Sequence, residues 1–588
     1  MTEIVVSPES PQPGEPPRQR KVRPGSGWGG RFAASPYLLL VPAAVALAGV
    51  SLYPLFYGVR ASFTHYLYGR DFGTNGLTNY RNAWNDEFFR QAMETTAKYV
   101  ICTVTIETLL GLGLALLVSR EIRFSSPIRV GLILPMTIAP VVVGVMWRLI
   151  YDSGVGVTDP LFQLFGASPP DVLAHNTSAF IAVVVVDVWE WTPLIFLIVL
   201  AGLQSMPQEP LEAARVDGAG RVRLFMDHTL PMLMPVLLVA ITLRTIDAIG
   251  TFDQIYVLTQ GGPGTATRLI SIYAYNTAFL FTQYGQAAAM LVMLLIMVML
   301  LMVVAVRLMR RAARCARMPR IGLYVGIALI LVVALFPFWW MVDTSLKQPV
   351  DIFGGVTLYP HHPTTSNYSR LFDVYHFGAY LENSLIIVAV SVAFSLTIGT
   401  LAAYALARFQ LRFGLNQSAL VVALLVRMIP GILLVIPLYI TLAKWGLLNT
   451  RLGLILIYTG LNTSFVIWMM QSFLAEIPRD IEEAAMVDGD SRLTALWRVV
   501  IPLAAPGLAA TAIFCVITTY NDFLIALSLT STTQAQTVPV GVSTLIGKIQ
   551  IEYGPMAAAG VIGALPIVIF ALVVQRHFVR GLTLGAVK

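Results

Sequence analysis

EAARVDGAGRVRLFMDHTLPMLMP, residues 212–235, is a polar stretch set between long apolar runs, and it occurs again in altered form 271 residues later. The second copy, residues 483–506, is EAAMVDGDSRLTALWRVVIPLAAP. The two copies align without a gap at Glu-Ala-Ala, at Asp-Gly and at both prolines. A motif that is repeated at one spacing indicates that the chain contains two related halves.

Each copy predicts a helix–turn–helix that lies outside the membrane. Pro207 and Pro478 suit a helix start, and the Glu-Ala-Ala that follows favours a helix. Asp-Gly ends this helix because glycine tolerates positive φ, and the two later prolines let the backbone bend into the next apolar run. An amphipathic connector would explain one copy. Two matched copies favour a surface that presents its first helix to a partner.

The pattern EAA-x-x-DG-(x)12-P-x-x-x-P resembles the EAA loop in the membrane subunits of binding-protein-dependent ABC importers, especially the carbohydrate-uptake group with a maltose-type permease pair. The resemblance runs from about Pro36 to the C-terminus. It implies that each loop is a coupling helix, which docks on a separate ATPase subunit. The positions that match the motif are Glu212, Ala213, Ala214, Asp217, Gly218, Glu483, Ala484, Ala485, Asp488 and Gly489. One departure is Asp490, which stands where the first copy has Ala219 and bears on the geometry of the second turn.

The composition is typical of a polytopic membrane protein. Of 588 residues, 56% are hydrophobic and only 12% are charged. A spanning helix needs roughly 20 apolar residues, and helices are expected because a lipid-exposed backbone must satisfy its own hydrogen bonds. The sequence therefore predicts an all-α protein with about twelve transmembrane helices in two homologous six-helix halves. The candidate spans are Pro36–Tyr57, Tyr99–Val118, Val130–Leu149, Phe180–Leu203, Pro231–Ile249, Ala287–Val306, Ile321–Met341, Ser384–Leu406, Ala419–Ile440, Leu452–Leu474, Pro502–Thr519 and Met556–Val574.

The predicted organisation has two permease halves joined by a basic linker. Further matched pairs support it, such as Asn79-Tyr80 with Asn367-Tyr368 and Pro140 with Pro430. A cleaved signal peptide is the rival interpretation of the first apolar run, but that run continues without a charge to Tyr57 and is long enough to span. The expected parts are a disordered basic tail (1–31), a first half (32–306, EAA loop 207–235), a linker with six arginines (307–320) and a second half (321–588, EAA loop 478–506).

Charge predicts the orientation. Most of the 39 Lys and Arg residues fall in the tail, the linker and the loops on their side of the membrane, and such an excess is expected in the cytoplasm. This places both EAA loops and both termini in the cytoplasm of a multi-pass protein of the plasma or inner membrane. The net charge of +7 is explained by this topology, so no nucleic-acid partner is expected.

The chain shows no sequence signature of an enzyme. The nearest approach to a phosphate-binding loop, GVSTLIGKI at residues 541–549, has the wrong glycine spacing and an isoleucine where Mg²⁺ needs Ser or Thr. Cys102, Cys315 and Cys515 are far apart, and neither a disulfide framework nor a metal site is indicated. We therefore expect no cofactor on this chain and Mg-ATP hydrolysis on partner ATPase subunits.

A few ionisable groups lie inside the predicted spans, where each should face a partner charge or a water-filled path. Asp187 and Glu190 share a helix face and are flanked by Trp189 and Trp191. Carboxylates and aromatic faces would suit a path for a neutral sugar. The alternative is internal pairing of Asp187 or Glu190 with Arg148, and of Arg244 with Asp247. Internal pairing is also the favoured interpretation of Arg244 and Arg427. The full set is Glu107, Arg148, Asp187, Glu190, Arg244, Asp247 and Arg427.

Further path candidates follow the fifth and eleventh spans, at positions that the resemblance places near the transport path. From the residues alone, these side chains could equally cap helix ends, and capping is favoured. Asn462, in the tenth span, could bond either cargo or a neighbouring helix. With Asp247, these further candidates are Asp253, Tyr256, Asn462, Asn521 and Asp522.

The function expected from these features is that of a fused permease in an ATP-driven importer of mono-, di- or oligosaccharides. Its expected partners are an ATPase dimer at the cytoplasmic face, an extracytoplasmic solute-binding protein, the sugar and the bilayer. An importer of glycerol-phosphate or another polyol stays open, since it would need arginines that carboxylates do not already neutralise. A twelve-span carrier driven by an ion gradient would have no reason to contain matched EAA loops. For a non-transport membrane scaffold or enzyme, the sequence shows no catalytic constellation.

Overall fold

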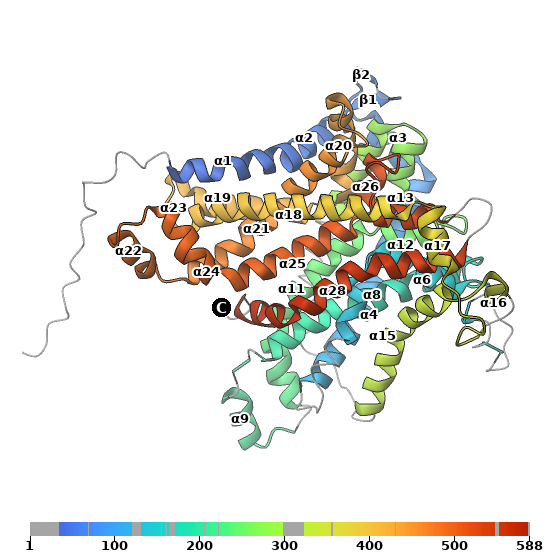
Figure 1. Cartoon of the computed structure of the whole chain (residues 1–588), viewed down its shortest axis with the longest axis horizontal. Coiled ribbons are helices and arrows are strands. Elements are labelled where there is room, and N and C mark those ends of the chain that lie inside the picture. Colours follow the sequence, from blue (N-terminus) through green and yellow to red (C-terminus); the bar gives the residue numbers. More distant parts are fainter. Residues whose placement is uncertain are drawn as a thin grey trace, which may run out of the picture.

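The computed structural model describes residues 35–68, 70–119, 131–154, 156–158, 162–163, 171–204, 206–207, 209–220, 223–297, 323–353, 357–429, 431–546 and 552–585. The predicted tail (1–31) and linker (307–320) lie outside this set. The described part is almost wholly helical (Figure 1). Its one sheet is an antiparallel hairpin of β1 (Thr64–Leu67) and β2 (Arg70–Thr74).

The first half contains long apolar helices linked by short ones. In chain order these are α1 (Ser35–Leu47), η1 (Ala48–Leu52), α2 (Tyr53–Ser62), α3 (Thr78–Asn85), α4 (Glu87–Val118), η2 (Leu134–Thr137), α6 (Pro140–Tyr151), α8 (Asn176–Gln204), α9 (Glu209–Val216), η3 (Leu224–Thr229), α11 (Leu230–Gly250), α12 (Asp253–Leu258), α13 (Ile270–Tyr275) and η4 (Asn276–Leu280). A further apolar helix covers Tyr284–Met297.

The second half has a similar series of long and short helices, with α16 where the first half has the hairpin. Its elements are α15 (Leu323–Ser345), α16 (Pro349–Phe353), α17 (Ser366–Asp373), α18 (Phe377–Arg408), η5 (Arg412–Gly414), α19 (Leu415–Met428), α20 (Gly431–Trp445), α21 (Arg451–Glu476), α22 (Arg479–Val487), α23 (Arg492–Ala495), η6 (Leu496–Val500), α24 (Ile501–Leu503), α25 (Ala505–Asn521), α26 (Leu524–Leu529), α27 (Val538–Thr544) and α28 (Tyr553–Gly585).

Within the described residues, six helices are long and apolar enough to cross a membrane, and nine are if each bent pair counts as one span. These nine coincide with nine of the twelve predicted spans. The described parts of the other three predicted spans also fall on helices, namely Tyr284–Met297, α15 and α28. The all-α, two-half, polytopic fold expected from the sequence is confirmed.

Three spans expected to be continuous are bent. The helices in the third and ninth predicted spans turn by 107° and 92°, and those in the eleventh by 78°. Ala139 and Ile429, which precede Pro140 and Pro430, have extended backbones with ψ of 129° and 119°. A residue before proline is pushed out of the helical region, and proline cannot donate the next helical hydrogen bond. The same span is therefore bent in both halves, and in each the residue before the matched proline has an extended backbone.

The two halves pack against each other through a shared apolar core. One cluster of buried residues extends from Tyr66 in the first half to Ile567 in the second. Phe252 and Phe523, which occupy matching positions of the repeat, have ring centroids 6.3 Å apart. Equivalent positions of the sequence repeat therefore contact each other where the two halves meet.

A matched hydrogen-bonded clasp closes each half at one end. The Asn79 side-chain amide donates to the carbonyls of Ser62 and Thr64 at 2.9 and 2.7 Å. Its counterpart Asn367 donates to the carbonyls of Ser345 and Lys347 at 2.9 and 2.8 Å. All of these groups are buried, so each asparagine satisfies two carbonyls that water does not reach.

Replacing Asn367 by alanine is expected to strand both carbonyls and to lower the free energy of unfolding by about 2 kcal/mol. Asn79→Ala should do the same in the first half. The control is Asn82→Ala, since Asn82 is exposed on α3. Thermal unfolding of the purified chain in detergent measures the effect, and equal melting temperatures for Asn367→Ala and Asn82→Ala would refute the clasp.

Candidate functional site

The two EAA segments form short helices, α9 and α22, which end in the same turn. Gly218 and Gly489 both have positive φ, +79° and +102°. The backbone bonds also match: Asp217 and Ala219 donate to Ala213 and Ala214 at 3.0 and 2.9 Å, and Asp488 and Asp490 donate to Ala484 and Ala485 at 3.0 Å each. Asp490 in place of alanine therefore leaves the turn unchanged. A glycine is required there because other residues rarely adopt such φ values.

A second helix follows each turn, as predicted. In the first half it begins as a π-helix, η3, and continues into α11. In the second half α23 leads into the π-helix η6, and the Ser491 hydroxyl caps α23 by accepting from Thr494 N at 3.2 Å. The helix–turn–helix form is thus present in both copies.

One face of each short helix points away from the protein. Val216 and Val487, at matching positions before Asp-Gly, are each 87% exposed. Glu212 and Glu483 lie one turn earlier on the same face and are exposed too. The remaining motif residues Ala213, Asp217, Gly218, Ala484, Asp488 and Gly489 are exposed, whereas Ala214 is buried and Ala485 half-buried. A single exposed valine is ordinary, but the same apolar residue exposed at both matched positions indicates a contact surface.

These two valines were not among the site residues predicted from the sequence. The sequence did contain a signal for them: both copies read Val-Asp-Gly, and the valine lies four residues after the glutamate of Glu-Ala-Ala. In Figure 1, α22 lies at the left and α9 at the lower left, away from β1 and β2 at the top and from α16 and α17 at the right. The paired faces therefore occupy one end of the molecule.

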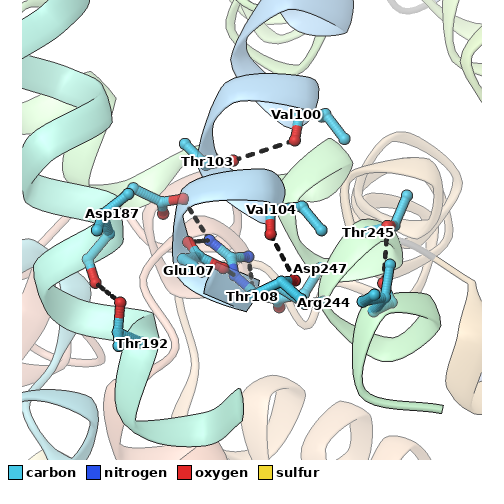
Figure 2. Close-up of polar contacts among 12 residues, drawn as sticks. Val100, Thr103, Val104, Glu107, Thr108, Asp187, Thr192, Arg244, Thr245 and Asp247 are labelled. Atoms are coloured by element: carbon cyan, nitrogen blue, oxygen red, sulfur yellow. Dashed lines mark hydrogen bonds and ion pairs between the residues drawn. The ribbon is translucent and has the colours of Figure 1, made fainter. Parts of the chain in front are cut away.

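A buried ion cluster joins three helices of the first half. Arg244 on α11 lies between Glu107 on α4 and Asp187 on α8, and all three side chains are fully buried. Its Nε is 2.7 Å from Glu107 Oε2, and its Nη1 is 2.8 Å from Asp247 Oδ2. Figure 2 shows these carboxylates converging on the guanidinium, whose Nη2 also bonds Asp187. The fork of arginine suits such multiple recognition.

The internal-pairing alternative was right for Arg244 with Asp247 and wrong for Arg148. The Arg148 guanidinium donates to the carbonyl of Val257 at 2.9 Å and bonds neither Asp187 nor Glu190. The partner of Asp187 is Arg244, with a further hydrogen bond from Gln254 Nε2 at 2.7 Å. Arg427, also expected to be paired, forms no ion pair with a described residue and lies over the stacked rings of Phe465 and Phe514.

Most of the predicted aromatic and acidic cluster is packed in the interior of the protein. The Trp189 ring is buried against Trp147 and Phe338, with centroids 5.7 and 5.6 Å away. Glu190 is fully buried, and its carboxylate oxygens have no hydrogen-bond partner among the described residues. Two members are more open. Trp191 is half-buried with the Arg244 guanidinium 5.2 Å from its ring centre, and the Asp247 side chain is 50% exposed.

The candidates after the fifth and eleventh spans meet where the halves touch. The Tyr256 ring stacks on Phe252 with centroids 4.9 Å apart and lies 6.0 Å from Phe523 of the other half. The Asn521 amide donates to the carbonyl of Thr137, also across the halves, at 3.4 Å. These residues therefore help to hold the two bundles together.

Capping, the favoured interpretation, applies to Asp522 and not to Asp253. Asp522 accepts from the Ile525 amide at 3.2 Å and from the Tyr458 hydroxyl at 2.8 Å. Asp253 begins α12, and that helix has no side-chain cap bond. Asn462 bonds a neighbouring helix, since its amide donates to Thr519 of α25 at 2.7 Å.

The chain matches a known protein family in two places. The sequence profile described as "Binding-protein-dependent transport system inner membrane component" matches residues 107–317 and again 395–584, more than half of the chain. The chain is 36% identical over 266 residues to the sulfoquinovosyl glycerol transport system permease protein SmoH of Agrobacterium fabrum, covering 45% of this chain and 93% of that protein.

Two relatives come from one organism, Thermococcus litoralis. The trehalose/maltose transport system permease protein MalG is 37% identical over 274 residues, covering 46% of this chain and 98% of MalG. The corresponding protein MalF is 39% identical over 217 residues, covering 37% of this chain and 73% of MalF. Each relative thus spans less than half of this chain, which contains the family domain twice.

Proposed function

This chain belongs to the family of binding-protein-dependent transport system inner membrane components, and from that premise we propose that it is the fused permease pair of an ATP-driven importer of sugars. The observation that carries the proposal is the pair of matched faces on α9 and α22, each with an exposed valine and an exposed glutamate. Two such faces at one end of the molecule suit a partner that is itself a pair of similar subunits.

The partner at these faces is an ATPase dimer that binds and hydrolyses Mg-ATP. Closure of the dimer would bring α9 and α22 together, and the two helical bundles would turn with them. Because the halves touch at equivalent positions such as Phe252 and Phe523, a rotation of one bundle against the other would open the path on alternate sides. The faces lie in the cytoplasm in this arrangement, as do both termini.

The opposite end of the molecule suits an extracytoplasmic solute-binding protein. Large apolar side chains there are exposed in both halves: Tyr68 at 78%, Leu77 at 67%, Val350 at 73% and Tyr359 at 63%. Exposed apolar residues gathered at one end are typical of a protein–protein contact. Tyr68 follows β1, Leu77 precedes α3, Val350 lies on α16 and Tyr359 lies between α16 and α17. Figure 1 places these elements away from α9 and α22.

The cargo is a mono-, di- or oligosaccharide. The three relatives above are named for trehalose or maltose and for a sulfoquinovosyl glycerol. In the first half Asp247 and Trp191 are the more open members of the polar cluster, and together they offer a hydrogen-bond acceptor and an aromatic face. Glycerol-phosphate is the alternative cargo: Arg244 is neutralised by carboxylates and Arg148 is bonded to a carbonyl, but Arg427 forms no ion pair with a described residue.

Reconstitution tests the proposal. Proteoliposomes that contain the chain, its ATPase subunits and its binding protein should take up sugar with ATP inside, and uptake should persist when ionophores collapse the proton and sodium gradients. A thermal-shift screen of the binding protein against sugars and phosphorylated polyols selects the cargo. Uptake that needs a gradient and no ATP would show a secondary carrier instead.

A further inference from the structure

The second coupling helix, α22, is held to the membrane bundle through a buried polar contact. Glu482 on α22 lies beside Arg408, the last residue of α18, and their side chains are 5% and 4% exposed. Glu482 Oε2 is 2.9 Å from Arg408 Nε, and the Tyr404 hydroxyl, one turn earlier on α18, donates to Glu482 Oε1. The Nε–Oε2 contact is an ion pair without hydrogen-bond alignment, so the directional link between α18 and Glu482 is the hydrogen bond from Tyr404.

Arg408 ties the same contact to a third helix. Its Nη1 donates at 3.0 Å to the carbonyl of Ile477, the residue that follows α21. Arg479, the first residue of α22, donates from Nη2 to the carbonyl of Ala407 at 3.3 Å. The ends of α18 and α21 and the start of α22 therefore meet in one polar joint, defined by Tyr404, Arg408 and Glu482.

In the part of the chain that the structure describes, the first coupling helix has an apolar contact at this point instead. The position that matches Glu482 is Leu211 on α9, which is 8% exposed. Leu211 belongs to an apolar cluster with Leu114, Val118 and Leu233. Apolar contact is non-directional, so α9 can slide or tilt while it stays buried. A comparable shift of α22 would separate Glu482 from its partners.

We propose that Tyr404, Arg408 and Glu482 are positioning residues that transmit the movement of α22 to α18 and α21, so that the second bundle follows its ATPase subunit as a rigid unit. The first bundle follows through a contact that yields. This inference rests on the proposed function, because it takes α22 to be an ATPase docking helix. The two halves then respond unequally to the same closure, although their turns and docking faces match.

The test uses the full chain with its ATPase subunits in lipid nanodiscs. Arg408→Leu with Glu482→Leu removes both charges together and gives α22 the residue that α9 has. Tyr404→Phe with Glu482→Gln weakens the joint more mildly. Three quantities are measured: co-purification of the ATPase, ATP hydrolysis, and the distance between spin labels at Leu77 and Val374. Both label sites are exposed, and the background lacks the three native cysteines.

With Mg-ATP and vanadate the label distance should change in the parent chain. In the joint variants, the amount of ATPase that co-purifies and the rate of ATP hydrolysis should stay within twofold of the parent. The change in label distance should fall by at least half. Leu211→Met, which conserves volume in the first half, should keep it. A contact that merely stabilises the fold would instead reduce ATPase binding and the distance change together.

A full distance change in both joint variants would overturn the proposal, and so would parallel losses of binding and movement. If the double leucine variant does not fold, the Tyr404→Phe, Glu482→Gln chain decides. If the parent chain does not bind ATPase subunits, the proposed function itself is contradicted. If the parent binds them and the joint variants show the full distance change, only the role of the joint is contradicted.

Discussion

Arg244→Ala is expected to prevent the chain from accumulating as a folded, monodisperse protein. The guanidinium bonds three carboxylates from two other helices and its own, and Glu107 and Asp187 are fully buried. Removing one partner of a buried pair leaves uncompensated charge and costs about 3–5 kcal/mol. A chain of marginal stability would lose most of its folded population. Fluorescence-detected size-exclusion chromatography and thermal melting in detergent measure the loss.

A second variant separates charge from packing. Arg244→Met combined with Glu107→Gln and Asp187→Asn removes the buried charges together, so it should melt closer to the parent chain than Arg244→Ala does. Arg148→Met is the matched control, because Arg148 bonds only a backbone carbonyl and should cost less. Should Arg244→Ala melt at the temperature of Arg148→Met, the cluster would not be what holds α4, α8 and α11 together.

The sequence predicted this cluster only in part, for a physical reason. Arg244 and Asp247 are three residues apart on one helix, and that spacing alone places them on one face. Pairing between helices depends on how the bundles pack, which spacing does not encode. Hence Arg148 was the wrong partner for Asp187, and Glu107, 137 residues from Arg244 in the chain, was not assigned to it.

The parts predicted best are those decided by local chemistry. Asp-Gly requires a turn with positive φ wherever it ends a helix, so the shape of both EAA loops followed from a few residues. The bends were missed although Pro140 and Pro430 were recognised as a matched pair. A proline inside an apolar run is compatible with either a mild kink or a full break, and the choice depends on what neighbouring helices can fill.

Val487→Asp is expected to weaken binding of the ATPase subunit at least about tenfold, on the order of 1.4 kcal/mol. Val487 is 87% exposed on the face that carries Glu483, so a docked partner would bury it. An aspartate there would bring an unpaired charge into the contact, which costs free energy when it loses its water. Val216→Asp should act alike in the first half, since Val216 has the same exposure and the same turn.

The control lies on the same helix. Ile481 is 41% exposed but projects from the side of α22 opposite Glu483, so Ile481→Asp should leave ATPase affinity within about twofold, a difference of less than 0.5 kcal/mol. Affinity is measured by biolayer interferometry with the chain in nanodiscs, and melting temperatures check that each variant is folded. Because the two faces are matched, the variant with both aspartates should bind more weakly than either single one. Equal affinity for Val487→Asp and Ile481→Asp would mean that the ATPase does not dock on this face, and the matched exposure of the two valines would then need another partner.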